Sequence, residues 1–299
     1  MENTILEIKG LRKVYKDVVA LKELSFSVQQ GQVFGLLGPN GSGKTTTLGI
    51  LLGVLRANKG DFSWFNNGTS DENRKRIGAL LETPNFYPYL NAYDNLVVVA
   101  KIKGLIDYEN RIDEVLKRVN LFERKKSKFR TFSLGMKQRL ALASTMLSNP
   151  DVYVLDEPTN GLDPEGIAEI RNIILEIAKE GKTIIIASHI LDEIEKICTH
   201  VAIMRKGELL QIGSIQEILS QERLVLLKAR DLTKLKEIID QSSDVKFIDI
   251  RDNELIVSVA DEFETDLLNK MIAEKGIYLS GIKEHRKNLE TTFLEIIKS

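Results

Sequence analysis

Short apolar runs alternate along the chain with stretches of helical spacing. Residues 5–8 and 24–28 alternate apolar and polar side chains, which predicts strands with one buried face. Residues 33–37 are apolar on both faces, as in a strand buried within a parallel sheet. Further apolar strands are expected at 77–81, 152–155, 183–187 and 201–204. Because strands and helical stretches alternate, we expect an α/β fold with a mostly parallel sheet.

Two regions depart from this alternation. Residues 91–146 have a mainly helical pattern and are expected to form an inserted helical lobe. From 221 to 299 the pattern predicts strands, two amphipathic helices and a hairpin at Asp252-Asn253. We therefore expect a main domain over 1–220 and a small α+β appendage over 221–299.

Composition and charge narrow the class of protein. Of 299 residues, 43% are hydrophobic and 28% charged, which is typical of a globular chain. Lys and Arg number 42 against 43 Asp and Glu, so no overall basic field favours nucleic acid. Cys198 is the single cysteine, which indicates a reducing compartment. No signal peptide and no apolar run of about 18 residues is present, so we expect a cytoplasmic protein that reaches a membrane only through a partner.

A complete phosphate-loop pattern, G-x-x-x-x-G-K-[ST], spans residues 38–45. Its glycines allow backbone N–H groups to point inward around phosphates, and the helix expected over 45–55 directs its N-terminus at the anion. Lys44 is predicted to reach the β- and γ-phosphates, and the Thr45 hydroxyl to ligate Mg²⁺. The predicted nucleotide-binding residues of this loop are Gly38, Asn40, Gly41, Ser42, Gly43, Lys44, Thr45 and Thr46.

A second motif places two acids after an apolar run. Residues 152–155 precede Asp156 and Glu157, and acids at the carboxyl end of a buried strand lie where α/β sheets bind ligands. We expect Asp156 to hold Mg²⁺ and Glu157 to act as the base that polarises the attacking water.

A third motif identifies a family resemblance. Residues 132–139, Phe-Ser-Leu-Gly-Met-Lys-Gln-Arg, resemble the signature motif of ABC transporter ATPases. Tyr15, the segment 161–164 and His189 fall in the order of that family's adenine-stacking aromatic, D-loop and switch histidine. The resemblance covers about residues 4–220.

The resemblance implies a P-loop nucleotide-binding domain with an N-terminal antiparallel β subdomain and a helical lobe. It implies ATP and Mg²⁺ as cofactors, and a homodimer or paired ABC subunit closed over two ATP molecules. Ser133 and Gly135, at a helix start that favours anions, would face the γ-phosphate of the opposite subunit, with Asp163 nearby. Tyr15 would stack on adenine, although half-buried packing is an alternative. A separate multi-span membrane subunit is the implied partner.

Two departures refine the resemblance. Glu82 stands where most family members carry Gln, so a carboxylate near Mg²⁺ is expected there, and Leu134 replaces the first Gly of the signature pair. With the segments 86–90 and 289–294, these features resemble ATPases of bacitracin-type and lantibiotic exporters and of drug exporters.

The predicted function is an ATP-hydrolysing motor on the cytoplasmic face of the membrane, which drives a separate transmembrane subunit that exports peptide antibiotics or drugs. Export of another cargo (ion, lipid or polysaccharide) and a soluble regulatory ABC ATPase remain as alternatives. A single cassette argues against the two-cassette ribosomal class, and the short interval between Lys44 and Asp156 leaves no room for the coiled coil of chromosome ATPases. Phe86, Tyr87 and Tyr89 are expected either to contact the membrane partner or to pack within the lobe. The basic run 124–130 is expected to be solvated or to touch lipid headgroups.

Overall fold

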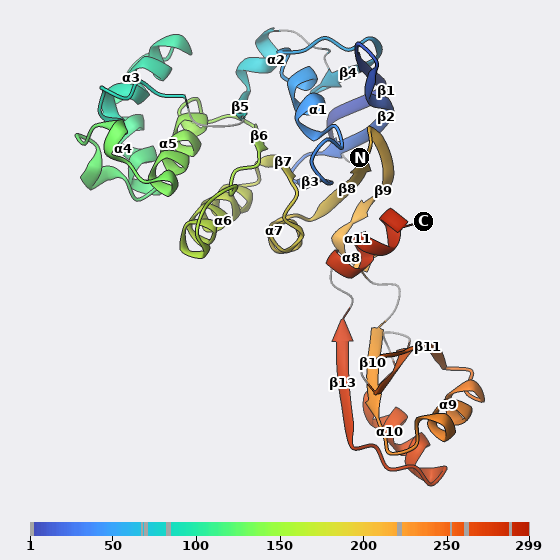
Figure 1. Cartoon of the computed structure of the whole chain (residues 1–299). Coiled ribbons are helices and arrows are strands. Elements are labelled where there is room, and N and C mark those ends of the chain that lie inside the picture. The colour runs from blue at the N-terminus through green and yellow to red at the C-terminus, as the bar shows by residue number, and fades with distance from the viewer. Residues whose placement is uncertain are drawn as a thin grey trace. The chain divides into compact units, whose positions relative to one another are not determined.

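The computed structural model describes residues 3–66, 68, 71–81, 85–219, 223–251, 253–259, 263–286 and 289–298. The chain forms two compact units, Met1–Gly213 and Ser214–Ser299 (Figure 1).

A six-stranded sheet with the order β5-β6-β7-β3-β8-β9 forms the centre of the first unit. Its strands are β3 (Val33–Leu37), β5 (Ile77–Leu80), β6 (Val152–Asp156), β7 (Thr183–Ser188), β8 (His200–Arg205) and β9 (Glu208–Ser214). Neighbours from β5 to β8 are parallel, and every residue of β3, β6 and β7 is buried. Continuous apolar runs are what a strand covered on both faces requires.

The register of this sheet brings three loop starts to one edge. Leu37 at the end of β3 lies opposite Ser188 at the end of β7, and Asp156 at the end of β6 lies opposite Ala187. Because the strands run parallel, the segments that follow them leave from the same carboxyl edge.

An antiparallel sheet of β1 (Thr4–Tyr15), β2 (Val18–Gln29) and β4 (Lys59–Trp64), in the order β2-β1-β4, packs on the parallel one. Lys16, at φ 50°, lies in the turn between β1 and β2. The rings of Phe26 and Phe34 stack with centroids 5.3 Å apart and join the two sheets in one hydrophobic core.

Helix α1 (Lys44–Leu51) is shorter than the predicted 45–55. Gly53 adopts φ 76°, its N–H donates to the carbonyl of Ile50, and the Leu55 N–H donates to the carbonyl of Gly49. A left-handed glycine of this kind ends a helix by satisfying its last carbonyls.

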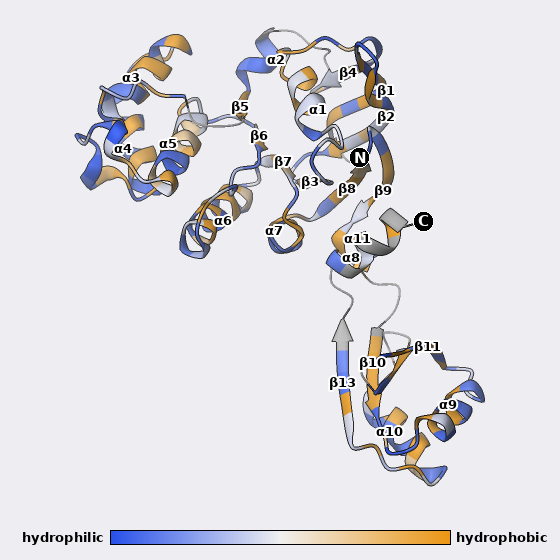
Figure 2. Ribbon diagram, in the orientation of Figure 1, coloured by the Kyte–Doolittle hydropathy of each residue, from blue (hydrophilic) through white to orange (hydrophobic). Residues whose placement is uncertain are grey.

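Helices between β5 and β6 gather on one side of the first unit (Figure 1). They are α3 (Ala92–Ile102), α4 (Glu109–Arg118), the 3-10 turns η1 (Phe122–Arg124) and η2 (Phe129–Thr131), and α5 (Leu134–Met146). The remaining helices of this unit are α2 (Asp71–Lys75), α6 (Pro164–Lys179) and α7 (Leu191–Ile197). Along α6 hydrophobic and hydrophilic residues alternate at helical spacing (Figure 2), and the buried ones include Ile170, Ile173, Ile174 and Ile177.

The second unit contains a four-stranded antiparallel sheet in the order β11-β12-β10-β13. Its elements are α8 (Ile215–Leu219), β10 (Arg223–Lys228), α9 (Leu232–Asp240), β11 (Val245–Arg251), β12 (Glu254–Val259), α10 (Thr265–Glu274), β13 (Gly281–Arg286) and α11 (Leu289–Lys298). The succession from β10 to β13 is βαββαβ, the ferredoxin-like arrangement. Residues of α9 and α10, such as Leu235 and Leu268, share one core with the sheet.

The predicted fold class is therefore confirmed: an α/β unit with a mostly parallel sheet, an antiparallel β subdomain and inserted helices, followed by a small α+β unit.

Replacing Ile185 by Ala should destabilise the first unit by about 2–5 kcal/mol, because this side chain is fully buried in β7 and its loss leaves a cavity. Urea denaturation followed by the fluorescence of Trp64, the single tryptophan and fully buried in the same unit, measures this change. Val18→Ala, at a side chain 66% exposed, is the matched control. Equal unfolding midpoints for the two variants would contradict the assigned core.

Candidate active site

The loop Gly38–Gly43 between β3 and α1 depends on glycine for its shape. Gly41 and Gly43 have φ values of 79° and 106°, which side chains disfavour. A Cβ on Gly38 would lie 2.3 Å from the carbonyl oxygen of Met204, and one on Gly43 would lie 2.7 Å from that of Ala20. The loop therefore fits tightly against β2 and β8, and its backbone N–H groups are held in the curve that binds phosphates.

Lys44 folds back over this loop and is only 5% exposed. Its ammonium group donates to the carbonyl of Gly38 at 2.7 Å, and it lies 3.5 Å from Glu157 Oε1. The lysine of the phosphate loop and the predicted base are therefore in direct contact.

Glu157 follows β6 in a left-handed conformation, with φ 46°. Its N–H donates to the carbonyl of Ala187 at 2.9 Å, which fixes the backbone against β7. The second carboxylate oxygen, Oε2, lies 2.9 Å from His189 Nδ1. The structure therefore brings Lys44, Glu157 and His189, predicted separately, into one network at the carboxyl edge of the sheet. No local feature of the sequence gives these contacts.

Two of the predicted metal ligands lie within the described residues, and both are hard oxygen donors. Asp156 ends β6 and is 2% exposed, and Thr45 is exposed in the first turn of α1. A carboxylate and a hydroxyl are ligands that Mg²⁺ accepts together with phosphate and water oxygens. Among the described residues, no group of three or more His, Cys, Asp and Glu side chains could hold a metal by itself. Glu82, the third predicted ligand, lies outside the described residues.

The signature motif and the segment 161–164 border one pocket of about 450 Å³. Ser133 caps α5, its hydroxyl oxygen accepting from the Met136 N–H at 3.3 Å, and Gly135 has open space beside its Cα. Asp163 caps α6 by accepting from the Gly166 N–H at 2.9 Å. Both segments contribute to this pocket, so the two predicted dimer contacts lie side by side in one subunit.

Arg139 links three helical segments through contacts that the sequence did not predict. Its guanidinium donates to the carbonyl of Val119 at 3.1 Å, and Nε lies 3.3 Å from Glu169 Oε2. Because it joins α5 to the end of α4 and to α6, it fixes the signature helix against the rest of the unit. Its position at the end of the segment that resembles the signature motif was the available hint.

Tyr15 stands at the end of β1 and is 41% exposed. The ammonium of Lys13 lies 4.9 Å from the centre of its ring. The ring is therefore accessible, as an adenine platform requires.

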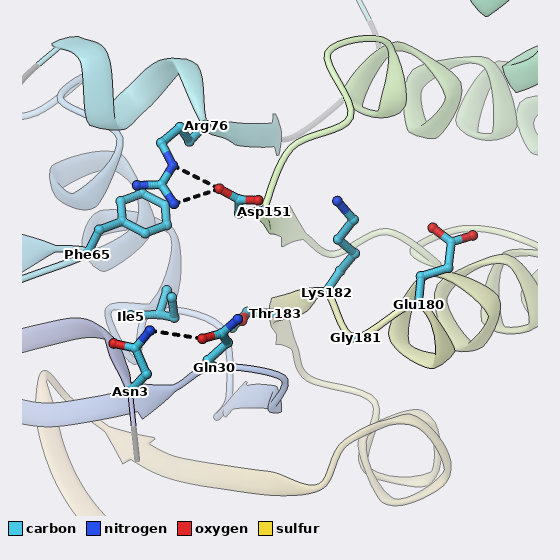
Figure 3. A pocket seen from close by; sticks show the side chains of 10 residues that line it. All are labelled: Asn3, Ile5, Gln30, Phe65, Arg76, Asp151, Glu180, Gly181, Lys182 and Thr183. Atoms are coloured by element: carbon cyan, nitrogen blue, oxygen red, sulfur yellow. Dashed lines mark hydrogen bonds and ion pairs between the residues drawn. The ribbon is translucent and has the colours of Figure 1, made fainter. Parts of the chain in front are cut away.

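Two further features, a second pocket and the single cysteine, lie away from the carboxyl edge of the six-stranded sheet. A pocket of about 440 Å³ forms where β6 and β7 begin, bordered by the Arg76–Asp151 ion pair and by Lys182 (Figure 3). It lies at the amino ends of the strands whose carboxyl ends carry Glu157 and His189. Cys198 is buried, and burial raises the pKa of its thiol, so it stays neutral and unreactive.

Comparisons with known proteins agree with this geometry. The sequence profile described as "ABC transporter" matches residues 21–160. The bacitracin transport ATP-binding protein BcrA of Bacillus licheniformis is 38% identical, over 99% of this chain and 98% of the relative. The lantibiotic transport ATP-binding protein SrtF of Streptococcus pyogenes is 38% identical, over 69% of this chain and 89% of the relative.

Solved structures with the same fold include cbiO1 of Clostridium perfringens, described as part of the ABC transporter complex cbiONQ. It has a TM-score of 0.66 and 32% identity over 74% of this chain and 92% of that chain. The ATP-binding cassette MJ0796, in a dimeric post-hydrolysis state bound to ADP and Pi, has a TM-score of 0.63 and 25% identity over 70% of this chain and 98% of that one.

A phosphate loop, an acidic strand end and a signature helix on one α/β unit define a nucleotide-hydrolysing cassette. The chain belongs to the ATP-binding proteins of ABC transporters. It is an ATPase that binds ATP, and cassettes of this family act as dimers with a transmembrane partner. None of its described helices is long and apolar enough to cross a membrane.

Replacing Gly38 by Ala should weaken ATP binding at least tenfold, because the new methyl group overlaps the carbonyl of Met204 and displaces the loop. Titration with a fluorescent ATP analogue measures the affinity. Gly31→Ala is the matched control, since φ there is also positive, at 79°, but no atom lies within 4 Å of the added carbon. Unchanged affinity in Gly38→Ala would contradict the described loop packing.

Proposed function

We propose that this chain is the ATP-hydrolysing motor subunit of a membrane exporter for peptide antibiotics of the bacitracin or lantibiotic type. The observation that carries the motor assignment is the contact of Glu157 with both Lys44 and His189 beside the glycine loop. The names of the bacitracin and lantibiotic transport relatives, with the match to the bacitracin protein over 99% of this chain, support the cargo class.

In the proposed reaction, the loop N–H groups and Lys44 bind the β- and γ-phosphates. The Glu157 carboxylate accepts a proton from water as the water oxygen bonds to the γ-phosphorus and the bond to the bridging oxygen of ADP breaks. His189, held by Glu157 through Nδ1, orients this carboxylate and the γ-phosphate. Mg²⁺, held by Thr45 and Asp156, would supply neutralising charge at the phosphates.

ATP binding would change the partners of Lys44. Its ammonium is engaged by the Gly38 carbonyl and by Glu157, and the more highly charged phosphates compete for it. Once Lys44 turns to the phosphates, Glu157 is released to hold water. This exchange couples nucleotide binding to the readiness of the base.

Dimerisation follows from the exposed signature pocket. Ser133 and the N-terminus of α5 offer hydrogen-bond donors and a positive helix end, and the pocket beside them is open. We infer that this pocket closes over the γ-phosphate bound by an opposite subunit, either an identical chain or a paired ABC subunit. Two ATP molecules would then hold the dimer together until hydrolysis.

The membrane subunit would dock at an apolar groove beside α3. This groove, of about 400 Å³, is lined by Asn85, Phe86, Tyr87, Asn95, Val98, Val99 and Ile102. Tyr87 is 48% exposed and Ile102 is 80% exposed, although Phe86 packs on Phe129 with ring centroids 5.2 Å apart. Exposed aromatic and aliphatic side chains around a groove are suitable anchors for a helix of a partner. Docking there would place the chain at the cytoplasmic face of the membrane.

Replacing Glu157 by Gln should reduce ATP turnover by about 10²–10⁴-fold, the range that general-base catalysis contributes. ATP binding should persist, and the chain should accumulate as an ATP-bound dimer. Phosphate release and size-exclusion chromatography with ATP measure the two effects. Glu176→Gln, on the exposed face of α6, is the control. Undiminished turnover would remove Glu157 from the mechanism.

The double change Phe86→Ala and Tyr87→Ala should abolish transport and leave the ATPase activity of the purified chain within about twofold. Bacitracin resistance of cells that carry the whole exporter measures transport. Val54→Ala is the matched control, because this side chain is 69% exposed but does not line the groove. Normal resistance in the double variant would show that the partner docks elsewhere.

A further inference from the structure

Positive charge is concentrated in one segment of a chain whose charges nearly cancel as a whole. Residues 121–137 contain six basic residues and one acidic residue, Glu123, a net charge of +5, whereas the whole chain has −1. The basic residues are Arg124, Lys125, Lys126, Lys128, Arg130 and Lys137. Such a local concentration creates a positive surface potential.

Four of these cations are exposed and have no carboxylate within ion-pair distance in the described part of the chain, and one of them, Arg124, donates to the Ser127 hydroxyl at 3.1 Å. Lys125 pairs with Asp113 at 2.8 Å, but within the described part of the chain no carboxylate lies within ion-pair distance of Lys126, Lys128 or Arg130. We call these three residues the basic strip. Because no carboxylate of the described residues pairs with these three side chains, their positive charge is available to bind an anionic ligand.

Backbone pairing places the basic strip beside exposed Tyr89. The Phe129 N–H donates to the carbonyl of Leu90 at 2.9 Å, and the Arg130 N–H donates to that of Pro88 at 3.1 Å. Phe129 is 6% exposed, whereas both of its neighbours in the strip are exposed. Tyr89 lies between the two accepting residues and is 65% exposed, so its backbone adjoins the strip and its side chain lies on the surface.

Aliphatic side chains extend the same region. Ile102 ends α3 and Ile106 follows four residues later, and their side chains are 80% and 85% exposed. Ile102 shares the groove with Tyr87, whose ring centre is 5.7 Å from that of Tyr89. Figure 2 shows hydrophobic residues along α3. The surface therefore combines unpaired cations, amphipathic tyrosines and protruding aliphatic groups.

This combination fits the boundary of an anionic lipid bilayer. Lys and Arg attract acidic headgroups, and Tyr is enriched where headgroups meet hydrocarbon. A free phosphate would need an enclosed site, and these cations are spread over an exposed surface. An acidic protein segment would not need the protruding aliphatic side chains.

We propose that the basic strip and Tyr89 bind the acidic headgroups of a lipid bilayer directly. This contact is additional to the docking of a membrane subunit, and it requires neither that subunit nor ATP hydrolysis.

Sedimentation of the purified full-length chain with lipid vesicles tests the proposal. One set of vesicles contains equal parts phosphatidylglycerol and phosphatidylcholine, and the other contains phosphatidylcholine alone. Each cation near an anionic surface contributes about fivefold in affinity, so replacing all three strip residues by Gln should weaken binding to the acidic vesicles roughly a hundredfold. The control replaces Lys59, Lys179 and Lys270, exposed cations elsewhere, by Gln. Unchanged ATP binding by the strip variant verifies its fold.

The expected result is binding to acidic vesicles only, kept by the control variant, lost by the strip variant and lost at 1 M salt, where the screening length is about 3 Å. Equal binding to both vesicle types, no binding by the unaltered chain, or equal loss in both variants would overturn the proposal. A strip variant that keeps vesicle binding but no longer copurifies with a membrane protein would assign the strip to a protein partner instead.

A Tyr89→Trp variant locates the contact. Trp64 is the single native tryptophan and is fully buried, so its signal should stay constant. The emission of the new tryptophan should shift to shorter wavelength with acidic vesicles. An unshifted emission on bound vesicles would place the contact elsewhere and contradict the role of Tyr89.

Discussion

Parallel hydrogen bonding between the buried strands β3, β6 and β7 determines where the glycine loop, Glu157 and His189 begin. The pairings Leu37 with Ser188 and Asp156 with Ala187 align the strand ends to within one residue. Since side chains alternate between the faces of a sheet, a slip of one residue would turn the acidic end of β6 away from the loop. The apolar side chains that bury these strands on both faces thus also fix the geometry of the site.

The burial of charged side chains at the candidate active site is a second constraint on its structure. Lys44 is 5% exposed and Asp156 is 2% exposed, and buried charges require partners or strong hydrogen bonds. Lys44 donates a hydrogen bond to the carbonyl of Gly38 and forms an ion pair with the Glu157 carboxylate. His189 contacts the same carboxylate through Nδ1. In the proposed mechanism, phosphates that enter the loop would replace existing partners of the lysine, and the position of Glu157 would then depend on the nucleotide.

The sequence predicted the parts of this site that are local. The spacing of the glycine loop and the apolar runs before Asp156 and His189 were sufficient to predict the sheet edge, because a buried parallel strand is readable from side-chain composition. The ion pair of Lys44 with Glu157 and the link from Arg139 to Glu169 could not be predicted, since each joins elements distant in sequence whose packing sets the distance. The early end of α1 at Leu51 depends on the left-handed Gly53 and on Leu55 packing against Gly49, which helical spacing alone does not reveal.

The helical part between β5 and β6 contains both surfaces assigned to the membrane, the groove beside α3 and the basic strip. Its signature helix also borders the pocket assigned to the opposite nucleotide, and Arg139 joins that helix to α6. The proposed contacts with the membrane subunit, with lipid and with the opposite nucleotide therefore all lie on one group of helices. A movement of this group would change all three contacts.

The central claim is that this ATPase drives a separate membrane-spanning exporter subunit. The most direct measurement is to tag the chain in the cells that produce it, solubilise their membranes in mild detergent, and identify what copurifies. We expect a multi-span membrane protein in stoichiometric amount. Recovery of the tagged chain only from the soluble fraction, without such a protein, would contradict the exporter assignment and leave the ATPase chemistry in place.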